Sequence, residues 1–226
     1  VTSMQEEEDI LRKKFDHARR AADDARHALE SSKSRGEVLS SLIRQTELGL
    51  LTGFHGRLGS LGTIDPRYDI AISTACPGLN NLVVEDVTTG QQCIEHLRKH
   101  KLGRANFILL KSLQVNPKAM APMATPENAP RLFDLVAPKD SRFVPAFYHQ
   151  LGDTLVARDL AQANRIAYGA KRWRVVTEDG QLIDKSGTMS GGGSRVIRCA
   201  MSSKLSEDVS PEQAARLEKE LGIARG

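Results

Sequence analysis

The chain is poor in cysteine and has no long hydrophobic run. Its three cysteines, Cys76, Cys93 and Cys199, lie far apart without a C-x-x-C pair, which is typical of reduced packing thiols in the cytosol or nucleus. Uncharged apolar runs such as 107–110 are far shorter than the roughly 20 residues that cross a bilayer. The sequence therefore argues against secretion and predicts that the protein has no membrane partner.

Aromatic residues and catalytic motifs are also scarce. Aromatics make up 4% of the chain, which excludes a broad base-stacking platform, because such a platform uses several rings. Neither a P-loop nor a G-x-S-x-G motif occurs. The run 189–192 looks like an ATP-binding-cassette signature and 191–194 like a phosphate nest, but no P-loop lysine accompanies them. We expect no catalytic residue and no cofactor, with a phosphate-handling α/β enzyme as the remaining enzymatic alternative.

The charge balance is mild, so only a local cluster points to nucleic acid. A net charge of +4 is small for a nucleic-acid-binding protein. The densest basic cluster is the run 171–174, and three later cations are expected to lie close to it. The predicted DNA-binding residues are Lys171, Arg172, Trp173, Arg174, Arg195, Arg198 and Lys204. These cations would neutralise phosphates while Trp173 stacks on one base. Strand alternation favours a second interpretation, in which Trp173 lies in the core and the arginines are solvated.

One helix carries the best metal candidate of the sequence. Cys93, His96 and His100 fall at positions i, i+3 and i+7, roughly on one helix face. A zinc site needs three or four ligands in tetrahedral arrangement, and Glu95 would point away from that face. The simpler interpretation makes Cys93 a core residue beside Ile94 and leaves the histidines solvated. We therefore predict no metal.

The two ends of the chain are predicted to be helical. Apolar residues from Leu11 to Leu29 follow the 4-3 spacing of a heptad repeat, which indicates a coiled coil. The heptad spacing stops near Gly36, and the apolar residues that follow have a different spacing. The helix over 5–50 is therefore expected to change partner from a coiled-coil strand to the globular body. Near the other end, Ser210 precedes a proline and a capping glutamine, which predicts a returning helix.

Between these helices the pattern predicts a mixed α/β body. A helix is expected over 66–75 with Asp65 as its cap, and a strand, helix, strand unit over 82–110 has the length of a parallel crossover. The four prolines within 116–130 predict an extended linker. The elements expected after the linker are a strand at 131–136, a helix at 144–151, a strand at 154–157, a helix at 159–168, and a strand at 172–177 with a hairpin turn at 179–180.

Glycines gather near both ends of this body. Gly53, Gly56, Gly59 and Gly62 recur every three residues in GFHGRLGSLG, and Gly191, Gly192 and Gly193 stand together in LIDKSGTMSGGGS. Glycine lets one main chain approach another closely, because it has no Cβ. An unpaired strand edge of this kind is usually matched by another strand. Two glycine-rich edges, one in each half, predict a joint between chains.

The segments GFHGRLGSLGTIDPRYDIAISTACPGLNNLVVED and LIDKSGTMSGGGS resemble the hinge domain of SMC (structural maintenance of chromosomes) proteins, and within that family the condensin members most. The resemblance covers about 38–201. It implies an α+β hinge fold of two subdomains flanked by an antiparallel coiled coil. The expected division is an arm at 1–50, subdomain I at 51–116, a linker at 117–130, subdomain II at 131–201 and a returning arm at 202–226.

The same resemblance implies a function. It predicts pairing with the hinge of the other condensin SMC subunit, weak homodimers when that partner is missing, and binding of single-stranded DNA near the junction of hinge and coil. It further implies a nuclear, chromosomal and cytoplasmic protein that serves chromosome condensation, with the family's ATPase residing in separate head domains. A module devoted mainly to DNA binding is the alternative. The residues expected at the dimer interface are Gly56, Gly59, Gly62, Gly187, Met189, Ser190, Gly191, Gly192 and Gly193.

Overall fold

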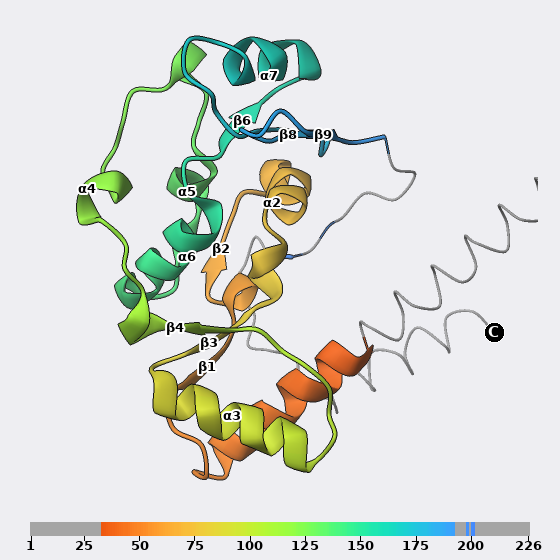
Figure 1. Cartoon of the computed structure of the whole chain (residues 1–226), viewed down its shortest axis with the longest axis vertical. Coiled ribbons are helices and arrows are strands. Elements are labelled where there is room, and N and C mark those ends of the chain that lie inside the picture. The colour runs from red at the N-terminus through yellow and green to blue at the C-terminus, as the bar shows by residue number, and fades with distance from the viewer. Residues whose placement is uncertain (1–32, 193–197, 199, 202–226) are drawn as a thin grey trace, which may run out of the picture.

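The computed structural model describes residues 33–192, 198, 200 and 201. Two small sheets lie toward opposite ends of its long axis (Figure 1). One has the strand order β1-β3-β4 and the other β6-β7-β8-β9, while β2 and β5 form a separate pair. The strands are β1 (Phe54–Arg57), β2 (Gly62–Thr63), β3 (Leu82–Val84), β4 (Phe107–Leu109), β5 (Ala137–Pro138), β6 (Leu155–Ala157), β7 (Val175–Thr177), β8 (Leu182–Ile183) and β9 (Met189–Ser190).

Short helices connect and cover these sheets. Besides the helical residues 33–47, they are α2 (Asp69–Ala75), α3 (Val87–Lys99), α4 (Pro117–Met120), α5 (Leu132–Leu135), α6 (Val144–Leu151) and α7 (Leu160–Ala167). Six 3-10 turns lie at Leu58–Ser60, Pro66–Tyr68, Pro77–Asn80, Leu110–Ser112, Pro126–Asn128 and Ser141–Phe143. This mixed α+β architecture of short elements confirms the predicted fold class. Within the described residues, no helix is both long and apolar enough to span a membrane.

Both predicted parallel crossovers are present. β3 pairs in parallel with β4, and β6 in parallel with β7. The helix between each pair begins at an aspartate N-cap: Asp86 accepts a hydrogen bond from the Thr89 N–H at 3.1 Å, and Asp159 accepts one from the Gln162 N–H at 2.8 Å. These bonds satisfy N–H groups that the first helical turn leaves without partners. Asp65 caps the turn at Pro66–Tyr68 in the same way, as predicted.

The helix at 33–47 packs on the β1-β3-β4 end of the molecule. Val38 and Leu42 are buried there in one apolar cluster with Cys93 and Leu97 of α3. The apolar positions that break the heptad pattern therefore face the globular body, as predicted for this end of the helix. The coiled-coil seam before residue 33 and the returning helix after residue 201 lie outside the described residues.

The largest apolar cluster draws from both halves of the chain. It joins Leu58 and Ile72 from the first half with Phe147 and Val176 from the second, and it also takes in Met201. α2 in particular packs against β7, although the linker separates the two in sequence. Each predicted subdomain holds its own sheet, yet the two share this core. The boundaries at 51–116 and 131–201 stay a prediction.

Two expectations for the middle of the chain are wrong. The linker 117–130 is not simply extended, because it contains α4 and a 3-10 turn. The strand expected at 131–136 is reduced to one bridge between Arg131 and Leu155, after which the chain turns into α5. Two kinds of contact stabilise this turn. The buried Arg131 guanidinium donates to both carboxylate oxygens of Asp134, at 3.0 and 2.8 Å, and the Asp134 N–H donates to the Arg131 carbonyl at 3.0 Å.

Candidate functional site

The glycines of the first half are covered by the same chain. A Cβ on Gly59 would collide with the Ala200 carbonyl oxygen, and one on Gly62 would lie 2.8 Å from Phe147 Cζ. Gly56 adopts a positive φ of 92° at the bulge in β1. All three are buried. Gly59 and Gly62 thus make their close approach to neighbours within the chain, and a place for Gly56, Gly59 and Gly62 at a partner interface stays a prediction.

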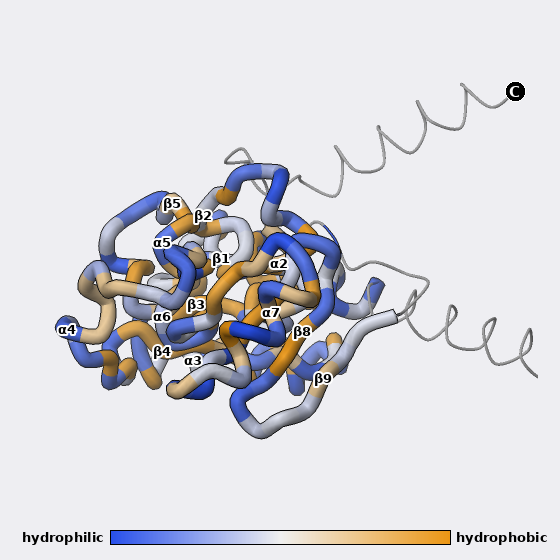
Figure 2. Tube along the Cα trace, turned by 90° about the horizontal axis from the view of Figure 1, so that it is seen from above, coloured by the Kyte–Doolittle hydropathy of each residue, from blue (hydrophilic) through white to orange (hydrophobic). Residues whose placement is uncertain are grey.

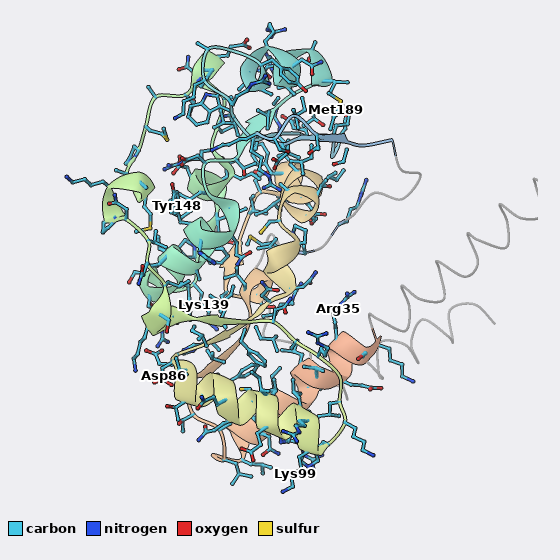
Figure 3. All side chains as sticks on the ribbon, viewed as in Figure 1. Arg35, Asp86, Lys99, Lys139, Tyr148 and Met189 are labelled. Atoms are coloured by element: carbon cyan, nitrogen blue, oxygen red, sulfur yellow. The ribbon has the colours of Figure 1, made fainter. Side chains whose placement is uncertain are left out.

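The glycines of the second half lie on an open edge. Among the described residues, β9 is the outermost strand of its sheet and pairs with β8 alone. Met189 is 51% exposed, and Ser190, Gly191 and Gly192 are exposed as well. A Cβ on Gly187 or Gly192 would meet nothing within 4 Å. Figure 3 shows Met189 on this strand, at the end of the molecule away from Lys99. Gly193 lies outside the described residues.

The free backbone groups of this edge belong to Met189. Asp184 donates its N–H to the Thr188 carbonyl at 2.9 Å, so those two residues form a hydrogen-bonded pair. Bonded and non-bonded pairs alternate along antiparallel strands. Met189, paired with Ile183, is therefore in a non-bonded pair, and its N–H and C=O point away from β8. The edge offers one donor and one acceptor to an incoming strand.

A tight turn joins β8 to β9. The Asp184 carboxylate accepts the Ser186 N–H at 3.0 Å, and Gly187 closes the turn at a φ of 94°. That backbone bond, together with weaker contributions from the Ser186 side chain and Arg174, lowers the pKa of Asp184. Because the folded pKa is depressed, the stabilisation is present above the unfolded pKa and is lost as pH falls through the folded value. Figure 2 shows hydrophobic β8 followed by this hydrophilic turn.

Trp173 is a core residue. Its side chain is 4% exposed and packs in a cluster with Leu155 and Ile183, while Lys171 Nζ lies 4.0 Å from the ring centroid. A base therefore finds no open ring here, and of the two interpretations the sequence left open, the structure has the core tryptophan. Lys171 and Arg172 are exposed, and Arg172 stacks 4.8 Å from the Tyr168 ring centroid.

Two other cations of the predicted DNA set lie within the described residues. Arg174 uses its guanidinium on Ala75, Thr154 and Asp184, and its role as a phosphate contact stays a prediction. Arg198 is exposed. Arg195 and Lys204 lie outside the described residues.

The metal candidate does not form a set of three: the His96 and His100 rings lie 4.3 Å apart between centroids, but Cys93 does not join them. Cys93 is fully buried, and burial raises its pKa to about 11, as it does for Cys76. His96 bonds Ser41 Oγ at 2.8 Å, and His100 Nδ1 bonds the His96 carbonyl at 2.9 Å. The part of the chain that the structure describes contains no group of three or more potential metal ligands. Ile94, expected in the core, is 56% exposed.

A polar cleft that the sequence analysis missed lies beside helix 33–47. Its volume is about 460 Å³. Arg35, labelled in Figure 3, reaches it from the helix. The remaining lining residues include Arg104, three asparagines and no carboxylate: Val38, Pro77, Asn80, Asn81, Leu82, Arg104, Ala105 and Asn106. Arg104 and Asn106 flank one alanine just before β4, but Arg35 lies some 70 positions earlier, so spacing gave no signal for the cleft.

Comparison with known proteins identifies the fold and its relatives. The profile of the family "SMC proteins Flexible Hinge Domain" matches residues 51–167. "Structural maintenance of chromosomes protein 4" of Schizosaccharomyces pombe is 57% identical over 87% of this chain, and that of Homo sapiens 46% identical over 88%. The chain spans only 15% and 16% of the length of these two relatives.

Solved structures agree with the sequence comparison. The asymmetric dimer of the Geobacillus stearothermophilus SMC hinge domain matches with a TM-score of 0.59 at 25% identity, covering 92% of this chain and 86% of that one. The folded elbow of cohesin matches with a TM-score of 0.67 at 21% identity, covering 90% of this chain and 29% of that one, and shows a shared fold. The chain belongs to the family of SMC hinge domains.

Proposed function

We propose that this chain is the hinge dimerisation module of a condensin SMC subunit, the larger of the two, and that it pairs with the hinge of the other subunit in the service of chromosome condensation. The open edge of β9 carries the proposal, because no strand in the part of the chain that the structure describes pairs with the Met189 backbone groups. The printed names of the relatives and the dimeric Geobacillus hinge support it. The module performs no bond chemistry, and its place is the chromosome in the nucleus, with a cytoplasmic pool.

The test is the mass in solution of this chain mixed with the partner hinge. We expect a 1:1 complex by size-exclusion light scattering, and only weak homodimers of this chain alone. Met189→Pro removes the outward N–H and should weaken the complex about ten-fold, the value of roughly one hydrogen bond plus the bulk of the ring. Met189→Ala is the matched control, because it shortens the side chain and keeps the N–H.

The two variants separate the outcomes. Loss of affinity in Met189→Pro alone supports strand pairing at β9. Equal loss in both variants would assign the contact to the side chain. No complex between the unmodified chains would reject the proposed function itself.

We also propose single-stranded DNA as a second ligand, and the cleft beside helix 33–47 favours this. It is lined by Arg35, Arg104 and three asparagines. Guanidinium groups suit phosphates, and asparagine amides suit base edges. It also lies at the base of the helix that leads toward the predicted coil, where the resemblance to condensin hinges puts DNA.

Fluorescence anisotropy with a labelled oligonucleotide compares the two basic regions. We expect the double change Arg35→Gln and Arg104→Gln to weaken binding and to reduce the salt slope by about 0.7 for each lost phosphate contact. The matched pair Lys171→Gln and Arg172→Gln removes the same charge from the β7 end. If only the Lys171 and Arg172 double variant loses DNA affinity, the site lies at the cluster predicted from sequence. Salt-independent DNA binding by the unmodified chain would reject phosphate recognition.

A further inference from the structure

Arg174 connects the proposed interface to both halves of the core. Its Nη2 donates to the Ala75 carbonyl at 2.8 Å and its Nη1 to Thr154 Oγ1 at 3.2 Å. Its Nε lies 3.3 Å from Asp184 Oδ2, in the turn before β9. One side chain, about a quarter exposed, thus joins three segments that are far apart in sequence.

Two of these contacts are at helix ends. Ala75 is the last residue of α2, and its carbonyl is one of the four that a helix leaves without an internal partner. Thr154 is buried, and its hydroxyl donates to the carbonyl of Leu151, the last residue of α6. A cation at a helix C-terminus is favourable. Arg174 is therefore anchored at two rigid points before it reaches Asp184.

The third contact reaches the least supported part of the sheet. β8 and β9 have two residues each, and both residues of β9 are exposed. A strand pair this short has little stability of its own. Two contacts of the Asp184 carboxylate stabilise this strand pair. Its Oδ1 accepts the Ser186 N–H within the turn, and its Oδ2 faces Arg174.

We propose that Arg174 is a positioning residue that fixes the β8–β9 hairpin in the orientation required for partner pairing. The proposal rests on the proposed function, since it assumes that β9 is the pairing edge. Holding the β9 edge in place raises the fraction of molecules that are competent to bind. When the edge is freed, this fraction falls, and the apparent affinity for the partner falls in proportion.

Asp184→Asn is the sharpest test. The asparagine Oδ1 still accepts the Ser186 N–H, whereas its NH₂ group replaces the oxygen that faces Arg174. We expect faster amide exchange at Asp184 and Gly187 of the isolated chain, whose N–H groups are bonded across the turn. We also expect an association rate with the partner hinge about two- to five-fold lower, with an unchanged dissociation rate. The melting temperature should hardly move, which separates positioning from a general loss of stability. Arg174→Lys should act in the same direction, because a single ammonium nitrogen cannot span acceptors that three separate guanidinium nitrogens reach.

The control is Asp179→Asn, which removes the same charge from the neighbouring β7–β8 turn, where Asp179 is exposed. Unchanged exchange and association rate in Asp184→Asn would overturn the proposal, and so would an equal effect of Asp179→Asn. If the unmodified chain fails to bind the partner hinge, the proposed function fails while the exchange measurement still decides whether Arg174 orders the hairpin.

Discussion

Replacing Arg131 with methionine is expected to lower the free energy of unfolding by about 3 kcal/mol, the cost of breaking a buried charge network. The Arg131 side chain has no exposed surface. It bonds Asp134 and Asp153, at 2.8 and 3.1 Å for the closest oxygens. These carboxylates and the Asp134 hydrogen bond in particular raise its pKa. Methionine keeps an apolar stem in place of the arginine stem and removes the guanidinium, so the loss reports mainly the polar contacts.

Arg131 also organises the linker that the sequence presents as extended. Its two terminal nitrogens donate to the carbonyls of Ala119, Met120 and Ala121, at 3.0, 3.2 and 3.1 Å. Its guanidinium carbon lies 5.2 Å from the Phe133 ring centroid. Without the guanidinium these carbonyls lose their donors. We therefore expect proteolytic cleavage within 117–130 to become faster in the same variant.

Urea denaturation followed by circular dichroism measures the effect. Arg165→Met is the matched control, because Arg165 makes a bidentate pair with Glu127 of the same linker at 2.8 and 3.0 Å but is largely exposed. Exposed pairs contribute little. Similar midpoints for the two variants would contradict the account of Arg131 as the residue that holds the linker.

Gly59→Ala is expected to destabilise the isolated chain by about 2 kcal/mol, the range for an overpacked core. The added Cβ would collide with the Ala200 carbonyl oxygen, and backbone cannot move aside as a side-chain end can. Ala200 is itself held, since its N–H donates to Ser73 Oγ at 3.1 Å. The strain therefore falls on the backbone at Ala200, which packs against the core.

Thermal unfolding with Gly36→Ala as control tests this. Gly36 lies in the helix at 33–47, and a Cβ there meets nothing within 4 Å. Alanine favours a helix by up to about 1 kcal/mol over glycine, so the two identical substitutions should act in opposite directions. A Gly59→Ala chain that melts like the unmodified one but no longer pairs with the partner hinge would return this glycine to the interface.

Elements set by local chemistry could be predicted from the sequence. The caps at Asp65 and Asp159 need only a carboxylate before a helix, and the β7–β8 turn needs a residue such as Gly180, whose φ is 87°. The packing of Val38 on the globular body followed from a break in periodicity. These signals act within a few residues, so they were visible before the chain was folded.

Contacts between distant segments were the part that could not be predicted. Gly59 and Gly187 both look like glycines made for close approach, yet one meets Ala200 and the other faces open space. Arg174 alternates with Trp173 as the strand pattern requires, but its acceptor at Ala75 lies 99 positions away. Only the folded structure shows which backbone segments lie in contact. It therefore also shows which cations bond to groups of the same chain.

The most direct test of the account is hydrogen exchange at the amide of Met189 with and without the hinge of the other condensin SMC subunit. The N–H points away from β8 and has no partner within the described chain, so it should exchange rapidly in the isolated chain. We expect strong protection at Met189 once the partner is added, because an incoming strand would accept this hydrogen bond. A tight complex in which Met189 still exchanges rapidly would contradict the claim that the hinge joins its partner through β9.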